Sequence, residues 1–186
     1  MSVEETLTIE NAKPAHIDEL RKICIATTNE HFKKRPELVT LLFCDYYILC
    51  QPELTFILKD GEKIVGYIMG ADAGRYVKEF IPLFKTAVRK VSLIRALGLS
   101  VRPDKTLIKQ GFDYHLHINI LKPYTGKGYG KKLMDKLVET VKLRGAKGLY
   151  LGVGEDNDGA TRFYKKYGFT TNKRYKGWLS MVMKLK

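Results

Sequence analysis

Three glycines alternate along the segment from Gly126 to Gly130, with lysines between and after them. Glycine adopts positive φ angles and has no Cβ that would hold a ligand away from the backbone. If a helix begins here, its first N–H groups have no acceptor within the helix, and the helix dipole favours an anion. The side chains of Lys127, Lys131 and Lys132 add positive charge. The segment therefore predicts a cradle for a diphosphate group.

Two familiar phosphate-binding motifs fit this segment less well. A P-loop requires serine or threonine where Lys132 stands, and a glycine where Thr125 stands. A dinucleotide-binding fingerprint has the spacing G-x-G-x-x-G, whereas this turn reads G-x-G-x-G. A tight turn that needs glycine only for its backbone geometry is the alternative interpretation.

The elements on either side of the glycines predict a strand, a turn and a helix. Residues 115–121 alternate strictly, with Leu116, Ile118 and Ile120 on one side and histidines and an asparagine on the other, which is typical of a strand. A helix is expected from about Gly130, with apolar residues on one face, and Gly145 ends it.

The remaining patterns complete a β-α-α-β-β-insert-β-α-β-α-β-β order. Strands are expected at 7–9, 54–58, 63–69, 148–153, 169–174 and 178–185, and helices from Pro14, over about 37–50, and from Asn157 to Gly168. The strand-helix-strand unit over 115–153 requires parallel pairing, and the hairpins require antiparallel pairing. The fold class is therefore mixed α/β: a mostly antiparallel sheet of six or seven strands with helices on both faces.

A basic segment at about 76–112 lies before the fourth strand. It contains eight Lys/Arg against two Asp/Glu, and its apolar residues predict one or two helices, the second over Val91 to Leu99. We expect these helices to cover the sheet or the substrate entrance, within a single domain that spans residues 1–186.

Composition restricts the class of protein. Hydrophobic residues are 45% and charged residues 28% of the chain, as in ordinary globular proteins. The acidic N-terminus, the absence of a membrane-length apolar run and three unpatterned cysteines predict a cytoplasmic protein with reduced thiols. Residues 76–186 hold 24 Lys/Arg and 8 Asp/Glu, a balance of +16. Nucleic acid, a phosphate-bearing cofactor and a basic solvated surface all remain consistent with this charge.

Two blocks of residues together resemble the GNAT superfamily of acetyl-CoA-dependent N-acetyltransferases. The first is Thr125-Gly126-Lys127-Gly128-Tyr129-Gly130, in which Thr125 replaces the family's glutamine or arginine. The second contains Asn157, Ala160, Phe163-Tyr164 and Gly168-Phe169. A narrower likeness, carried by 52–56, 115–121, 145–148 and 151–153, is to the acetyltransferase-like domain of O-GlcNAcase proteins and its free-standing bacterial relatives.

The resemblance implies how acetyl-CoA binds. It lies in a V-shaped gap between the strands that end near Leu121 and Val153, and the backbone of Ile120 and Leu121 holds the pantetheine arm or polarises the acetyl carbonyl. The cofactor site implied in full comprises Ile120, Leu121, Thr125, Gly126, Lys127, Gly128, Tyr129, Gly130, Lys131, Asn157 and Tyr164. No metal is expected.

The resemblance also implies catalytic roles. Tyr164 matches the tyrosine that protonates the departing thiolate, although a place in the core would also explain it, and Asn157 also fits a helix N-cap. His117 is the candidate general base, with His115 or Asp113 in reserve, because imidazole titrates near pH 6.5. Structural histidines are the alternative, and a His115/His117 metal pair lacks a third ligand.

Three functions follow for testing. The first is direct acetyl transfer, in a ternary complex, to an amine of a small molecule or peptide. Family members often form homodimers, so a homodimer is one of the states to test, and the sequence itself does not indicate the oligomeric state. The second is a non-catalytic acyl-CoA-binding module, suggested by Asn119 where relatives often carry aspartate. The third is association with nucleic acid, suggested by the basic half and by Tyr175 and Trp178 among lysines.

Overall fold

The computed structural model describes residues 7–88 and 105–186, which form a mixed seven-stranded sheet in the order β1-β2-β3-β4-β5-β7-β6. The strands are β1 (Thr8–Asn11), β2 (Thr55–Asp60), β3 (Lys63–Asp72), β4 (Tyr114–Ile120), β5 (Gly148–Gly154), β6 (Thr170–Tyr175) and β7 (Trp178–Lys184). Every neighbouring pair is antiparallel except β4 and β5, which are parallel. The expected fold class is confirmed.

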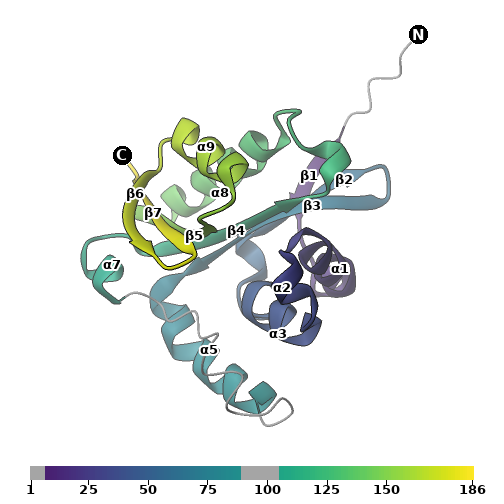
Figure 1. The fold of residues 1–186 in the computed structure, drawn as a ribbon, viewed down its shortest axis with the longest axis horizontal. Helices are drawn as coiled ribbons and strands as arrows, with labels where there is room; N and C mark the ends of the chain where they lie inside the picture. Colours follow the sequence, from purple (N-terminus) through teal and green to yellow (C-terminus); the bar gives the residue numbers. More distant parts are fainter. Residues whose placement is uncertain (1–6, 89–104) are drawn as a thin grey trace.

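Helices cover both faces of this sheet (Figure 1). One face carries α8 (Tyr129–Leu143) and α9 (Asp158–Tyr167). The other carries α1 (Ile17–Thr27), α2 (Glu30–Lys33), α3 (Pro36–Thr40) and α4 (Tyr46–Cys50). The helix expected over about 37–50 is α3 and α4 joined by one π-helical turn at Leu41–Asp45.

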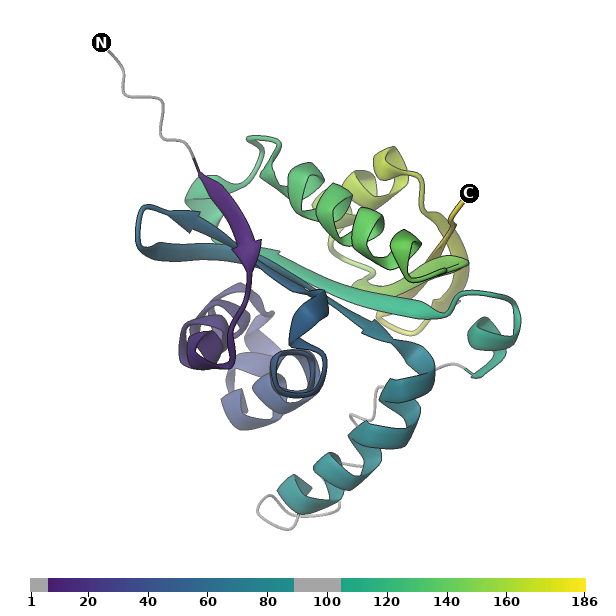
Figure 2. The same ribbon diagram turned by 180° about the vertical axis from the view of Figure 1, so that it is seen from behind.

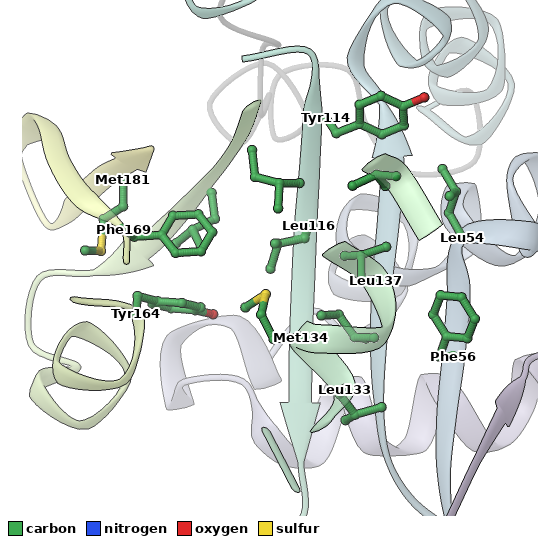
Figure 3. Close-up of a cluster of buried hydrophobic side chains, with 14 of the residues drawn as sticks. Leu54, Phe56, Tyr114, Leu116, Leu133, Met134, Leu137, Tyr164, Phe169 and Met181 are labelled. Carbon is green, nitrogen blue, oxygen red and sulfur yellow. The ribbon is translucent and has the colours of Figure 1, made fainter. Parts of the chain in front are cut away.

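Each face has its own apolar core. Beneath α8 and α9, side chains of the helices pack on alternate residues of β4 and β5, such as Leu116, Leu149 and Leu151 (Figure 3). Beneath α1–α4, buried residues such as Leu20, Tyr47 and Tyr67 form the second core. The alternation along β4 therefore sorts the strand's side chains between the two cores, as its sequence predicts.

The basic segment begins with α5 (Ala73–Val88), which extends away from the sheet, and ends with the short helix α7 (Lys105–Lys109) (Figure 2). The first predicted helix is thus present, with Tyr76 and Phe80 buried in the core beneath α1–α4. The second, at Val91 to Leu99, falls outside the described residues. None of the described helices is long and apolar enough to cross a membrane.

Candidate functional site

The two parallel strands separate soon after they begin. β4 pairs with β5 only at Tyr114↔Leu149 and His115↔Tyr150, although β4 continues to Ile120 and β5 to Gly154. A cavity of about 1190 Å³ lies between α8 and α9. It is lined by Ile118 and Ile120 of β4, by residues of both helices and by the end of β7, and by no residue of β5. Beyond His115 and Tyr150 the two strands are unpaired, as the V-shaped gap implied by the resemblance requires.

Hydrogen bonds to β3 decide which backbone groups of β4 face this gap. The N–H of Leu121 donates to the carbonyl of Val65 at 2.9 Å. Because backbone groups alternate sides along a strand, the N–H and C=O of Ile118 and Ile120 point away from β3 and toward the gap. The carbonyl of Leu121 accepts the N–H of Tyr124 at 2.9 Å. Both backbone groups of Leu121 are thus engaged within the protein, and Ile120 is the one of the expected pair that faces the gap.

The glycine turn follows directly and is held against the sheet. The hydroxyl of Tyr124 donates to Asp60 at 2.6 Å. Gly126 and Gly128 have φ angles of +75° and +85°, which only glycine adopts without strain, and a Cβ at either position would meet no atom within 4 Å. From Gly126 to Gly130, no backbone N–H donates to an acceptor among the described residues. The turn therefore presents a row of free N–H donors at the start of α8.

Gly130 has a different role from Gly126 and Gly128, since a side chain here would crowd the neighbouring helix. A Cβ at this position would lie 3.3 Å from two ring atoms of Phe163 on α9. This glycine lets α8 and α9 approach each other at the wall of the gap, so it serves helix packing where Gly126 and Gly128 serve turn geometry.

The lysines of the turn differ in their surroundings. Lys131 lines the cavity, and its ammonium lies 2.7 Å from Asp135, which also accepts the hydroxyl of Tyr167 at 2.9 Å. Lys127 lies over the ring of Tyr124, at 5.8 Å from its centroid. Exposed ion pairs are weak, so Lys131 can exchange Asp135 for a ligand phosphate at small cost.

The cavity brings most of the expected cofactor residues together. Those that line it are Ile120, Thr125, Gly126, Gly128, Gly130, Lys131 and Tyr164. Those outside its lining are Leu121, Lys127, Tyr129 and Asn157.

Tyr164 belongs both to the core and to the cavity wall. It is 7% exposed, and its ring packs against Phe163 and Phe169 at centroid distances of 5.4 and 5.7 Å. Figure 3 shows its hydroxyl directed toward Met134 on α8. Burial raises the pKa of Tyr164, so the phenol is protonated at neutral pH and is a weaker acid than an exposed tyrosine.

Asn157 caps α9. Its side-chain oxygen accepts the N–H of Ala160 at 3.0 Å, which satisfies one of the free donors at the helix start. Since Asn157 also lies outside the cavity lining, the geometry accounts for this residue through capping.

The two histidines lie on the face of β4 that is opposite to α8. Nε2 of His115 lies 2.9 Å from the hydroxyl of Tyr47, and Nδ1 of His115 is buried without a partner among the described residues. The ring of His117 meets Phe43 and Tyr47 edge-on, at centroid distances of 5.3 and 5.2 Å. Burial lowers the pKa of His115 to about 3 and that of His117 to about 4. Both rings are therefore neutral at pH 7, and both are weak bases.

Asp113, the other reserve base, lies at the far end of β4 from the glycine turn. Its carboxylate accepts the N–H of Lys147 at 2.9 Å and the N–H of Gly148 at 3.1 Å. It thus joins the start of β4 to the start of β5, and the structure gives it an architectural position away from the gap.

A second, smaller cavity of about 470 Å³ lies at the end of β4. Its lining combines the end of α1 with the segment after β4: Ala26, Thr27, Ile120, Leu121, Lys122, Pro123 and Thr125. Ile120 and Thr125 line both cavities, so the two are adjacent across the end of the strand. The sequence contains no signal for this cavity, because α1 and β4 are about ninety residues apart in the chain and local patterns do not report their contact.

The described residues contain no cluster of three or more His, Cys, Asp or Glu side chains placed to hold a metal ion. Cys24 and Cys44 are buried and Cys50 is half-buried, all three as free thiols. Burial raises the pKa of Cys24 to about 11, so this thiol is protonated and a poor nucleophile at neutral pH.

Known proteins with a similar sequence or fold include acetyltransferases. The profile of the acetyltransferase (GNAT) family matches residues 17–169. An uncharacterized N-acetyltransferase of Methanocaldococcus jannaschii is 42% identical over 62 residues, which are 33% of this chain and only 27% of that relative's length.

Among solved structures, that of SsHAT covers 96% of this chain and 98% of its own, with a TM-score of 0.82 and 24% identity. The PaiA N-acetyltransferase of Thermoplasma acidophilum, solved in complex with coenzyme A, covers 97% and 99%, with a TM-score of 0.63 and 14% identity. At these identities the two structures establish the shared fold.

Proposed function

The chain belongs to the acetyltransferase (GNAT) family, and we propose that it transfers an acetyl group from acetyl-CoA directly to an amine while both substrates are bound. The observation that carries this proposal is the gap between β4 and β5, which leads from unpaired backbone of Ile118 and Ile120 to the N–H groups at Gly126–Gly130. An extended arm of amide groups that ends in a diphosphate matches this arrangement, and coenzyme A has that form.

We assign the cofactor contacts on this basis. The backbone groups of Ile118 and Ile120 pair with the amides of the pantetheine arm, as a neighbouring strand would. The N–H groups from Gly126 to Gly130 take the diphosphate, because free donors and the helix dipole meet there. Lys131 turns from Asp135 toward a phosphate, and Lys127 adds charge at the rim.

The chemistry is an acyl transfer in which one C–N bond forms and one C–S bond breaks. The neutral amine attacks the thioester carbonyl, and a backbone N–H in the gap stabilises the negative charge that develops on the oxygen. The C–S bond then breaks, and Tyr164 donates its proton to the departing thiolate. The proton that the amine loses goes to solvent, and Tyr164 regains a proton from solvent, so the transfer balances. His117 lines neither cavity and is a weak base, so we assign it only to relaying the amine's proton.

Binding and turnover test the proposal separately. A crystal structure with acetyl-CoA should place the diphosphate at Gly126–Lys131 and the thioester beside Ile120 and Tyr164. Incubation with acetyl-CoA and a panel of amines should release free coenzyme A thiol only when an acceptor is present. A diphosphate located elsewhere would refute the proposed site.

A non-catalytic acyl-CoA-binding module is the second candidate, and one observation favours it. The amide of Asn119 donates to the hydroxyl of Tyr67 at 2.7 Å, so it is fixed in a structural contact at the position where relatives often carry an acid. Tight binding of acetyl-CoA, with no transfer to any amine of a broad panel, would support the module over the enzyme.

Four further properties of the protein are proposed here from the sequence and its family resemblance. They are the narrower likeness to the O-GlcNAcase-associated domain, a single domain that includes the basic segment, a cytoplasmic location and a homodimer. Nucleic-acid association rests on the rings of Tyr175 and Trp178, which stack on each other at 4.1 Å near Lys173. Such association predicts an affinity for single-stranded RNA that falls steeply as salt rises.

A further inference from the structure

The smaller cavity, at the junction of α1 and β4, lies where an acceptor would meet the acetyl group if the proposed function holds. Ile120 faces the gap with its backbone and lines both cavities. A molecule in the smaller cavity therefore lies next to the segment of β4 that we assign to the thioester. Its volume of about 470 Å³ is within the range of small-molecule sites, about 300–1,000 Å³.

The end of α1 gives this cavity a place for an ammonium group. α1 ends at Thr27, and both Ala26 and Thr27 line the cavity. The carboxyl end of a helix carries about half a negative charge and favours a cation. The last turn of α1 contains no basic side chain, and the hydroxyl of Thr27 donates to the carbonyls of Ile23 and Cys24 at 2.8 and 3.4 Å, so no cation of the helix itself satisfies that charge.

The opposite wall gives the cavity a place for an anion. Lys122 is the one charged residue in its lining, its side chain is exposed, and its ammonium has no ion-pair partner among residues 7–88 and 105–186. The segment that carries it is fixed, because the N–H and hydroxyl of Thr125 both donate to the carbonyl of Lys122, at 3.2 and 2.8 Å.

An acceptor with several positive charges, such as a polyamine, would need free carboxylates in the cavity lining. The nearby carboxylates are already paired with other side chains. Asp135 is the one acidic side chain in the lining of either cavity, and Lys131 and Tyr167 hold it. In the layer of α1–α4, Asp18 and Asp45 both pair with Arg21. An acceptor with several positive charges would find no free carboxylate in the described lining.

From this pattern we propose that the acceptor is a small molecule of amino-acid type, with its amine at the end of α1 and a carboxylate on Lys122. The proposal rests on the proposed transfer of acetyl to an amine and adds the class of acceptor. Such a molecule matches both signs of charge in the cavity and fits its volume.

The test compares free α-amino acids, their amides and spermidine as acceptors for the purified chain with acetyl-CoA. Release of coenzyme A thiol is followed, and rates are corrected for the fraction of neutral amine. We expect kcat/KM to be about 10-fold higher for an amino acid than for its amide, since the amide lacks the charge-assisted contact with Lys122. A peptide that begins with the same residue, and so lacks the adjacent carboxylate, should behave like the amide.

Lys122→Glu should abolish the preference for the free acid and raise the relative rate with spermidine, while the KM for acetyl-CoA stays within about 2-fold. The matched control is Lys109→Glu, in an exposed position on α7, which should keep the preference of the original chain. A preference for spermidine, for the peptide or for the amide in the original chain would overturn this inference and leave the proposed function intact. Binding of acetyl-CoA without transfer to any amine would overturn both.

Discussion

The hydroxyl of Tyr164 can be removed without removing the ring, so its role in catalysis can be tested apart from the role of the ring in core packing. Tyr164→Phe removes one oxygen and keeps the ring contacts with Phe163 and Phe169. Among the described residues this hydroxyl donates to no acceptor, so its removal leaves no hydrogen-bonding group without a partner. We therefore expect the free energy of unfolding to change by less than about 1 kcal/mol.

The expected effect on the rate is much larger. Removing a general acid typically costs about 10²–10⁴-fold, which is about 2.7–5.4 kcal/mol in the activation barrier. The assay measures kcat by thiol release at saturating acetyl-CoA and acceptor, with the Kd for acetyl-CoA from calorimetry. We expect kcat to fall by at least about 100-fold while the Kd changes little.

Tyr114→Phe is the matched control. Tyr114 is also 7% exposed in the same core, and it lies at the opposite end of β4 from the glycine turn (Figure 3). It should reproduce the small stability change and leave kcat unaltered. If Tyr164→Phe keeps kcat within about 3-fold of the original chain, the acid–base role is wrong and Tyr164 is a core residue only.

Three further predictions follow from the geometry. Gly128→Ala should lower the free energy of unfolding by about 1–2 kcal/mol in chemical denaturation, because its φ of +85° strains any side chain. Gly159→Ala, at ordinary φ and with its nearest contact at 3.8 Å, should cost less, and equal costs would contradict the argument. Stability should fall as pH drops from about 6.5 toward 4, by up to about 1.4 kcal/mol per pH unit for each histidine, because the unfolded chain binds protons there while His115 and His117 stay neutral in the folded protein. His115→Gln should flatten this dependence in urea titrations, and an unchanged slope would count against desolvation as its cause. Asp113→Ala should lower the melting temperature, because the N–H groups of Lys147 and Gly148 lose their acceptor. The KM for acetyl-CoA should stay unchanged, and a raised KM would place Asp113 in the site.

Local patterns predicted the elements that position the site. The alternation of residues 115–121 correctly placed Leu116 and the histidines on opposite faces of β4, because a strand's period of two is a local property. The glycines marked the turn, since positive φ at Gly126 and Gly128 depends on the turn itself.

Other features depend on contacts between distant segments and were not predicted. Asp113 binds the start of β5, and the backbone of Leu121 binds Val65 and Tyr124, which no pattern around either residue indicates. The cavity at Lys122 depends on where α1 ends relative to β4. Burial, which lowers the pKa of His117, is likewise a property of the packed layers and not of the strand alone.

The short pairing between β4 and β5 has a consequence for the stability of the folded protein in a cell. β1–β4 and β5–β7–β6 are two antiparallel half-sheets that share two residue pairs, so part of the edge of β4 lies inside the molecule with no strand to complete it. If the pantetheine arm fills that place, the metabolite acts as a structural element of the native state. A ligand at 100 times its Kd adds about 2.7 kcal/mol to the stability of a protein that binds it only when folded. The survival of this chain, and not only its rate of turnover, would then follow the supply of acetyl-CoA.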